Sequence, residues 1–222
     1  MNSIKAVAFD IDGTLYANWR LYIRIVPHFL KNLNFFLSYK KVRDILHRTA
    51  PLPDFYEYQA RLLADAMHVS VDTARTLIND KVYCGLCKYF PKIKPYKYAV
   101  ESFEVFKKAG LKCAILSDFP PQQKGDIWGA EKYCDVVLGS EGCGALKPSV
   151  YTFGTLAEKL GLKSEEILYV GNNIKADIIG AKNAGMKTAY LMPFWRRLFG
   201  LKLHHADISF KNYRQLQEIV LH

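Results

Sequence analysis

Residues 4–15 read IKAVAFDIDGTL, an apolar run followed by two carboxylates. The run over residues 4–9 predicts a short buried β-strand that ends at Asp10. Asp12 comes two residues later, and Gly13 has the backbone freedom that a tight loop needs. A carboxylate at a strand end can attack a phosphoryl group, and a second one nearby can transfer protons. Because Asp-Gly is also a common turn pair, the stretch alone leaves an ordinary acidic turn open.

The chain after Pro95 alternates short apolar runs with longer amphipathic segments. Strands are predicted at 112–116, 136–138, 167–170, 187–191 and 208–210, and helices at 98–109, 122–128, 150–160 and 174–184, with one more helix after the last strand. This alternation predicts an α/β fold, a Rossmann-like parallel sheet with helices on both faces. In such sheets ligands bind at the carboxyl ends of the strands.

The segment between the first strand and Pro95 has a different composition. It is aromatic, leucine-rich and basic, with helical spacing and few strand signals. We therefore predict an α-helical insertion over residues 16–95, and an α/β core made of residues 1–15 and 96–222. Asp54 follows a proline-rich break and is expected to cap a helix of this insertion.

Further polar groups stand at the ends of later predicted strands. Ser117 and Asp118 end the second strand, Lys147 precedes a proline and a helix, and Asn172 and Asp177 span a strand-to-helix turn. Each has an ordinary explanation by itself, as a helix cap or a surface side chain. All of them fall at strand ends of one predicted parallel sheet, so we expect them to meet at a single edge.

Composition and charge narrow the class of protein. Half of the 222 residues are apolar, as in a packed soluble globule. The sequence has neither an apolar run long enough to span a membrane nor a signal-peptide pattern, which predicts a cytoplasmic protein. The five cysteines are expected to be reduced, and the lone C-x-x-C at residues 84–87 favours a helix or turn over a zinc or redox site.

The net charge of +10 favours anionic partners. We expect this excess to be spread along the chain as a solvated basic surface. The sequence carries no nucleic-acid-binding signature, so nucleic acid is not an expected partner and small phosphorylated metabolites are.

These motifs resemble those of the haloacid dehalogenase superfamily of phosphotransfer hydrolases. The four that match are residues 10–15, Ser117, Lys147 with Pro148, and residues 171–177, and the helix through Met186 also fits. The insertion just after the first motif resembles the helical cap of the subfamily that includes phosphoglycolate phosphatase, β-phosphoglucomutase and haloacid dehalogenase.

The resemblance implies a phosphatase that depends on Mg²⁺ and hydrolyses a small phosphorylated metabolite through an aspartyl-phosphate. Asp10 would be the nucleophile and a metal ligand, and Asp12 the general acid/base and a metal ligand through its carbonyl group. Lys147 would offset the charge of nucleophile and phosphate. The residues implied to contact the substrate in the core are Gly13, Thr14, Ser117 and Asp118.

Asn172 departs from the family pattern, which usually has an aspartate there as a direct metal ligand. Asp177 would hold a metal-bound water. Since an amide oxygen can coordinate a hard cation without adding charge, we expect a working site with weaker Mg²⁺ binding. The acidic residue at Asp12 argues for chemistry at a phosphate ester, because the dehalogenases of the superfamily lack it. Two alternatives stay open: a β-phosphoglucomutase-like phosphotransferase, and a non-catalytic binding or regulatory protein.

Two other features bear on the substrate and partners. Arg20 and Arg24 stand among the aromatic residues of the predicted cap and are candidate substrate contacts. Residues 193–205, PFWRRLFGLKLHH, are unusually apolar and basic for a loop. They fit either a short amphipathic helix at an anionic membrane or a segment packed against the core, and we favour packing.

Overall fold

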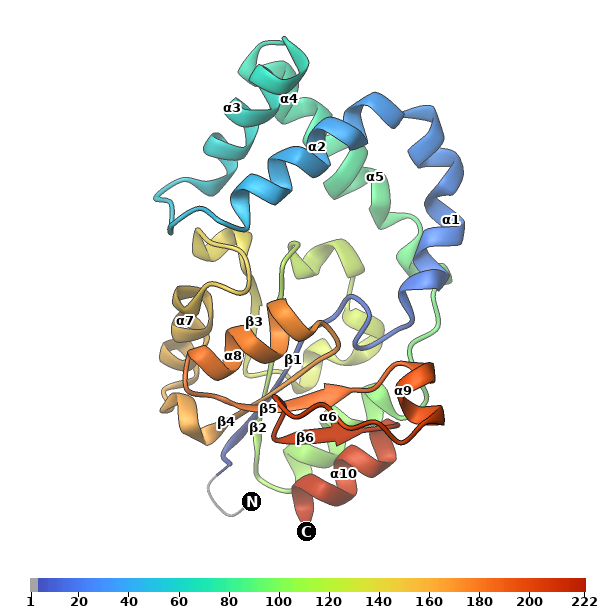
Figure 1. Cartoon of the computed structure of the whole chain (residues 1–222), viewed down its shortest axis with the longest axis vertical. Coiled ribbons are helices and arrows are strands. Elements are labelled where there is room, and N and C mark those ends of the chain that lie inside the picture. The colour runs from blue at the N-terminus through green and yellow to red at the C-terminus, as the bar shows by residue number, and fades with distance from the viewer. Residues whose placement is uncertain (1–3) are drawn as a thin grey trace.

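The computed structural model describes residues 4–222 and is built on a parallel sheet of six strands in the order β3-β2-β1-β4-β5-β6 (Figure 1). The strands are β1 (Ala6–Phe9), β2 (Lys112–Ser117), β3 (Val136–Gly139), β4 (Ile167–Gly171), β5 (Lys187–Leu191) and β6 (Ile208–Phe210). In the register Phe9 of β1 lies opposite both Ile115 of β2 and Val170 of β4. The carboxyl ends of the three central strands are therefore level with one another.

Helices cover both faces of the sheet, which confirms the predicted fold class. On one face α6 (Ala99–Lys108) and α10 (Tyr213–Leu221) bury apolar side chains such as Phe103 and Leu216 against β1 and β2. On the other face α7 (Val150–Leu160) and α8 (Gly180–Asn183) bury Phe153 and Leu156. Figure 1 shows these two layers on either side of the strands.

Between β1 and β2 the chain forms a helical insertion, drawn as the arch at the top of Figure 1. Its elements are α1 (Asn18–Lys31), α2 (Leu33–Leu46), α3 (Phe55–Met67), α4 (Val71–Ile78), a π-helical turn (Asn79–Tyr83) and α5 (Cys84–Cys87). The insertion has its own apolar core, to which Phe35, Val42 and Leu63 belong. Asp54 caps α3 as predicted by accepting a hydrogen bond from the Glu57 amide at 2.9 Å.

The prediction of a helix over residues 122–128 is wrong. The structure instead has 3₁₀ turns at Pro121–Lys124, Ile127–Gly129 and Glu131–Tyr133. Two consecutive prolines begin the segment, and Gly125 has a positive φ of 64°, so neither end can propagate an α-helix.

The segment after β5 also differs from its prediction. Residues 193–205 were expected to pack against the core, but α9 (Phe194–Leu198) and the residues after it are largely exposed. Of the apolar side chains in this segment only Leu203 is buried. The segment therefore presents an apolar surface to the solvent.

The structure also bears on the cysteines and on the expected absence of a membrane-spanning helix. All five cysteines are free thiols, and Cys84 and Cys87 lie on α5, in agreement with a helix or turn. Within residues 4–222, no helix combines the length and the apolar character that crossing a bilayer requires.

Candidate active site

Three charged side chains from distant parts of the chain meet at the carboxyl end of the central strands. The Lys147 ammonium lies 2.7 Å from Asp10 Oδ1 and 2.7 Å from Asp177 Oδ1. Asp10 directly follows β1, Asp177 lies in the π-helical turn after β4 (Ile174–Ile179), and Lys147 precedes α7. All three are buried, so the ammonium is surrounded by the two carboxylates and the Tyr169 hydroxyl, 3.1 Å away.

Burial and the opposite charges nearby shift the pKa values of Asp10 and Lys147 in opposite directions. Burial raises the pKa of Asp10 to about 7, Lys147 opposes the rise, and the neighbouring Asp177 and Asp12 add to it. For Lys147 burial lowers the pKa, but Asp10 and Asp177 outweigh it and hold the pKa well above the ordinary value. Lys147 is therefore a fixed cation at neutral pH, placed to offset negative charge at Asp10.

Asp12 lies beside this group and has its own partners. Its Oδ1 accepts a hydrogen bond from the Tyr16 hydroxyl at 2.5 Å, and its Oδ2 is 3.0 Å from the Lys124 ammonium and 3.4 Å from Ser117 Oγ. The Lys124 side chain is buried next to the ring of Phe90. Sequence reasoning missed both Tyr16 and Lys124, because nothing in the sequence separates Lys124 from the other lysines.

Asp177 organises the loop after β4. Its Oδ2 accepts hydrogen bonds from the backbone amides of Asn172 and Asn173, at 3.1 and 2.9 Å. A Cβ at Gly171 would come within 2.5 Å of the Asp177 carboxylate, so only glycine fits there. Asn173 caps the following turn by accepting from the amides of Lys175 and Ala176, at 3.0 and 2.9 Å. Both carboxylate oxygens of Asp177 are thus engaged by the protein itself.

Asn172 lies against the loop that carries Asp10. The Thr14 hydroxyl lies between the two side chains, 2.8 Å from Asp10 Oδ2 and 3.1 Å from Asn172 Oδ1. Gly13 permits this approach: its φ is 89°, and a Cβ there would lie 2.5 Å from Asn172 Nδ2.

The side-chain oxygens of Asp10 and Asn172 are of the kind that a hard cation prefers, and they include one carboxylate. Among residues 4–222 no cluster of three or more His, Cys, Asp or Glu side chains could hold a metal. Both Asp177 oxygens are held by Lys147 and by backbone amides, whereas the donor to Asp10 Oδ2 and to Asn172 Oδ1 is the rotatable Thr14 hydroxyl. Mg²⁺ is commonly held by one or two carboxylates together with substrate phosphate and water, so the oxygens of Asp10 and Asn172 fit it.

Asp118 lines the open site together with Asp10 and Asp12, and it also holds the backbone of Lys147. Its Oδ1 accepts from Ser140 Oγ at 2.7 Å and from the Lys147 backbone amide at 3.1 Å. Burial opposes ionisation of Asp118, but the nearby cations of Lys147 and Arg43 hold its pKa below the ordinary value. Ser117 is fully buried at the end of β2.

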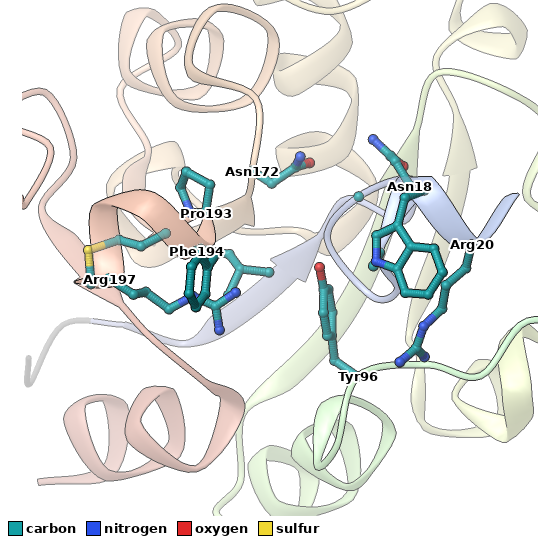
Figure 2. A pocket seen from close by; sticks show the side chains of 12 residues that line it. Asn18, Arg20, Tyr96, Asn172, Pro193, Phe194 and Arg197 are labelled. Carbon is teal, nitrogen blue, oxygen red and sulfur yellow. The ribbon is translucent and has the colours of Figure 1, made fainter. Parts of the chain in front are cut away.

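Two cavities adjoin one another here. A small one of about 140 Å³ is lined by Asp10, Asp12, Lys147 and Asp177, and a larger one of about 380 Å³ is lined by Arg20, Tyr96, Phe194 and Arg197. Asn18 and Asn172 line both. Figure 2 shows Asn172 at the rim of the larger cavity, with α9 on one side and the start of α1 on the other.

The two arginines of the insertion that were predicted to contact substrate differ in where their side chains lie. Arg20 lines the larger cavity and donates to the Lys94 carbonyl oxygen at 2.5 Å. Arg24 instead donates to the Arg20 carbonyl oxygen on its own helix, at 2.6 Å.

A buried ion pair links the insertion to the sheet, and the sequence did not reveal it. Arg43 of α2 contacts Glu141, which lies just after β3, and its guanidinium stacks on the Phe119 ring. Tyr83 donates a hydrogen bond to the same Glu141 at 2.7 Å. The insertion is therefore fixed to the rim of the site through buried charges.

Comparison with known proteins identifies the family of the chain. The family model for haloacid dehalogenase-like hydrolases matches residues 4–185. The chain is 27% identical to a glyceraldehyde 3-phosphate phosphatase of Methanocaldococcus jannaschii and 29% identical to a phosphoglycolate phosphatase of Vibrio parahaemolyticus. Each alignment covers 98% of this chain and 96% of the relative.

Among solved structures, the chain is similar to a phosphatase of the same superfamily from Thermococcus onnurineus, with a TM-score of 0.65 at 23% identity over 98% of both chains. This likeness concerns the fold. Taken with the family match over most of the sequence, it leads to one conclusion: the chain belongs to the haloacid dehalogenase-like hydrolases.

Proposed function

We propose that the protein is a Mg²⁺-dependent phosphatase that hydrolyses a small phosphorylated metabolite through an aspartyl-phosphate at Asp10. The observation that carries this proposal is the Lys147 ammonium held between Asp10 and Asp177, with Asp12 beside them. The names of the relatives support the substrate class, since phosphoglycolate and glyceraldehyde 3-phosphate are small phosphate esters.

In the first half of the reaction an Asp10 carboxylate oxygen attacks phosphorus, and the bond from phosphorus to the ester oxygen breaks. Asp12 gives its proton to the departing oxygen. Lys147 stays protonated and balances the charge that gathers on Asp10 and the phosphoryl group. Ser117, whose hydroxyl lies 3.4 Å from Asp12 Oδ2, would bind a phosphoryl oxygen that is not transferred.

In the second half Asp12 takes a proton from a water molecule whose oxygen attacks the same phosphorus. The bond from phosphorus to Asp10 then breaks, which releases inorganic phosphate and restores the carboxylate. Mg²⁺, held by Asp10, the Asp12 carbonyl group and Asn172, would supply positive charge beside the phosphate. Asp177 acts as a positioning residue for Lys147 and for the Asn172 loop.

The larger cavity would hold the rest of the metabolite. It joins the small cavity at Asn18 and Asn172, and the guanidinium groups of Arg20 and Arg197 can bind a second anionic group. This arrangement favours a short phosphate ester that carries a second anionic group over one whose remaining part is uncharged.

The test measures phosphate release from an aryl phosphate and from a panel of small phosphate esters, with and without Mg²⁺. The wild-type protein is expected to release phosphate from these substrates in the presence of Mg²⁺, and Asp10→Asn is expected to be inactive. Asp65→Asn, which removes an exposed carboxylate on α3, is the matched control and should keep wild-type activity. Undiminished turnover by Asp10→Asn would refute the proposal.

A further inference from the structure

The outer side of α1 is apolar where a solvent-facing helix is normally polar. The side chains of Trp19, Tyr22, Ile23, Val26 and Leu30 recur at intervals of three and four residues, which places them along one side of the helix. All of them are exposed, Leu30 to 63%. On the inner side Leu21 is buried in the core, and Ile25, four residues later, packs against the same cluster. The helix therefore shows an apolar stripe to the protein and another to the solvent.

A second apolar surface lies on α9 and the residues after it. Its members are Phe194, Trp195, Leu198, Phe199 and Leu201, all exposed, with Phe194 at 74% and Phe199 at 69%. Exposed aromatic and leucine side chains at this density mark an interaction site on most soluble proteins.

The two surfaces form one face, which we call the α1–α9 surface. Figure 1 shows α1 and α9 on the same side of the molecule. Trp19 of α1 and Phe194 of α9 line the same cavity, and in Figure 2 Phe194 and Arg197 lie across it from Asn18 and Arg20. The exposed apolar side chains of both helices are thus joined at the mouth of that cavity.

The basic excess of the sequence lies in the two stretches that contain α1 and α9, contrary to the expectation of an even spread, although Lys40 and Arg43 of the first stretch are paired with Asp44 and Glu141. Residues 13–43 and 178–206 hold eleven lysines and arginines and no aspartate or glutamate. The rest of the chain holds 20 basic and 21 acidic residues and is nearly neutral. The net charge of +10 therefore comes from the segments that carry α1 and α9.

Among the cations of this surface Lys31 and Lys202 are exposed. Arg20, Arg24, Arg196 and Arg197 are half-buried, and their guanidinium groups donate to backbone carbonyl oxygens. Within residues 4–222, no salt bridge involves any of six side chains of the two segments, namely Arg20, Arg24, Lys31, Arg196, Arg197 and Lys202. A second copy of the chain would bring like charges together, which is unfavourable. An anionic partner with an apolar layer beneath its charges fits better.

We propose that the α1–α9 surface docks the protein on an anionic lipid membrane. Tryptophan and tyrosine favour the interface between headgroups and acyl chains, and the leucine and phenylalanine side chains would enter the outer acyl layer. Lysine and arginine around them would bind lipid phosphate groups. Docking of this kind is peripheral and reversible, and it leaves the fold unchanged.

The test is co-sedimentation of the full chain with vesicles of phosphatidylcholine alone or mixed with phosphatidylglycerol. Wild type should sediment with the anionic vesicles and stay in solution with the neutral ones, and high salt should weaken sedimentation. The double variant Leu30→Glu/Phe199→Glu should bind at least about tenfold more weakly, since two carboxylates replace inserted apolar groups.

Val150→Glu is the matched control, because Val150 is also an exposed apolar residue, at 53%, and α7 lies on the other side of the molecule. It should bind vesicles as wild type does. Thermal unfolding of each variant separates loss of binding from loss of fold. Wild type that stays in solution with both kinds of vesicle would overturn the proposal, and so would equal losses in Val150→Glu and the double variant. Concentration-dependent self-association abolished by the double variant, without vesicle binding, would assign the surface to a protein contact instead.

Discussion

The sheet rim and the α1–α9 surface use charge in opposite ways. At the rim Asp10, Lys147 and Asp177 are buried, and each lies within 2.7 Å of an opposite charge. On the α1–α9 surface the cations have no acidic neighbour in sequence, and the apolar side chains between them face the solvent. Buried charge persists in a protein only where partners compensate its desolvation. The charges of the rim are therefore compensated within the protein, whereas the outer surface has the composition of a binding interface whose partner is another molecule.

The contrast is sharpest for the buried pair of Arg43 and Glu141. Arg43→Met should lower the free energy of unfolding by about 3–5 kcal/mol, because it leaves Glu141 buried without its cation. On the same helix Lys40→Met breaks only the exposed pair with Asp44 and should cost less than about 1 kcal/mol. Urea unfolding measures both.

A second substitution checks the cause of the Arg43 effect. Adding Glu141→Gln to Arg43→Met removes the unpaired charge, so it should restore most of the lost stability. If the double variant is no more stable than Arg43→Met, the loss comes from packing, and the distinction between paired and unpaired charge does not hold here.

The second prediction concerns the pH dependence of stability in metal-free protein. The pKa of Asp10 is raised from 3.8 to about 7, so between these values the folded carboxyl keeps a proton that the unfolded one has lost. The wild-type free energy of unfolding should therefore fall with rising pH across this window, and Asp10→Asn should lack that contribution. The stability gained by the variant relative to wild type should grow with pH, by at most about 4 kcal/mol at 1.4 kcal/mol per pKa unit.

Urea titrations at several pH values, in the presence of a chelator, follow this difference. Asp65→Asn gives the reference for the loss of an exposed carboxylate. A difference between Asp10→Asn and wild type that shrinks with rising pH would mean that Lys147 outweighs burial at the rim.

The third prediction separates a rim lysine from a surface lysine. Lys147→Ala should lower kcat by about a hundred- to a thousandfold, as expected when a preorganised group that stabilises the transition state is removed. Lys31→Ala, on the outer end of α1, should leave kcat within about twofold, because exposed substitutions distant from a site have small effects. Phosphatase assays on purified variants compare the two, and similar losses from both would contradict the assigned role of Lys147.

The smallest effect is expected at Asn172. Asn172→Asp adds a second carboxylate beside Asp10, so the Mg²⁺ concentration for half-maximal activity should fall by about tenfold. Asn173→Asp is the control, because Asn173 caps the turn and aspartate is an equally good cap. An unchanged metal dependence in Asn172→Asp would remove Asn172 from the ligand set.

Much of the rim could be predicted from the sequence for a physical reason. Parallel strands of equal register bring their carboxyl ends to one level, so the positions of Asp10, Ser117 and Asn172 followed from the apolar runs before them. Glycine also gave a local signal, since Gly13 could be assigned to a tight loop before any contact was known.

Other features depended on contacts that no local pattern encodes. Lys124 reaches Asp12 because proline and glycine convert an expected helix into 3₁₀ turns. Arg43 and Glu141 are far apart in the sequence, and neither belongs to a motif. The exposed side of α1 was missed because an apolar stripe at helical spacing predicts burial, and only the fold shows that these side chains face outward. For residues 193–205 the sequence left a membrane contact open, but packing against the core was favoured.

The account rests on Asp10 as the nucleophile that attacks phosphorus. Trapping the aspartyl-phosphate intermediate tests this role most directly. Protein mixed with substrate and Mg²⁺ is quenched in acid and treated with borohydride, which reduces an aspartyl-phosphate to homoserine, and the peptides are sequenced by mass spectrometry. Homoserine at position 10, and none at Asp12 or Asp177, is the predicted result. Homoserine at another aspartate, or none at any position during steady turnover, would contradict it.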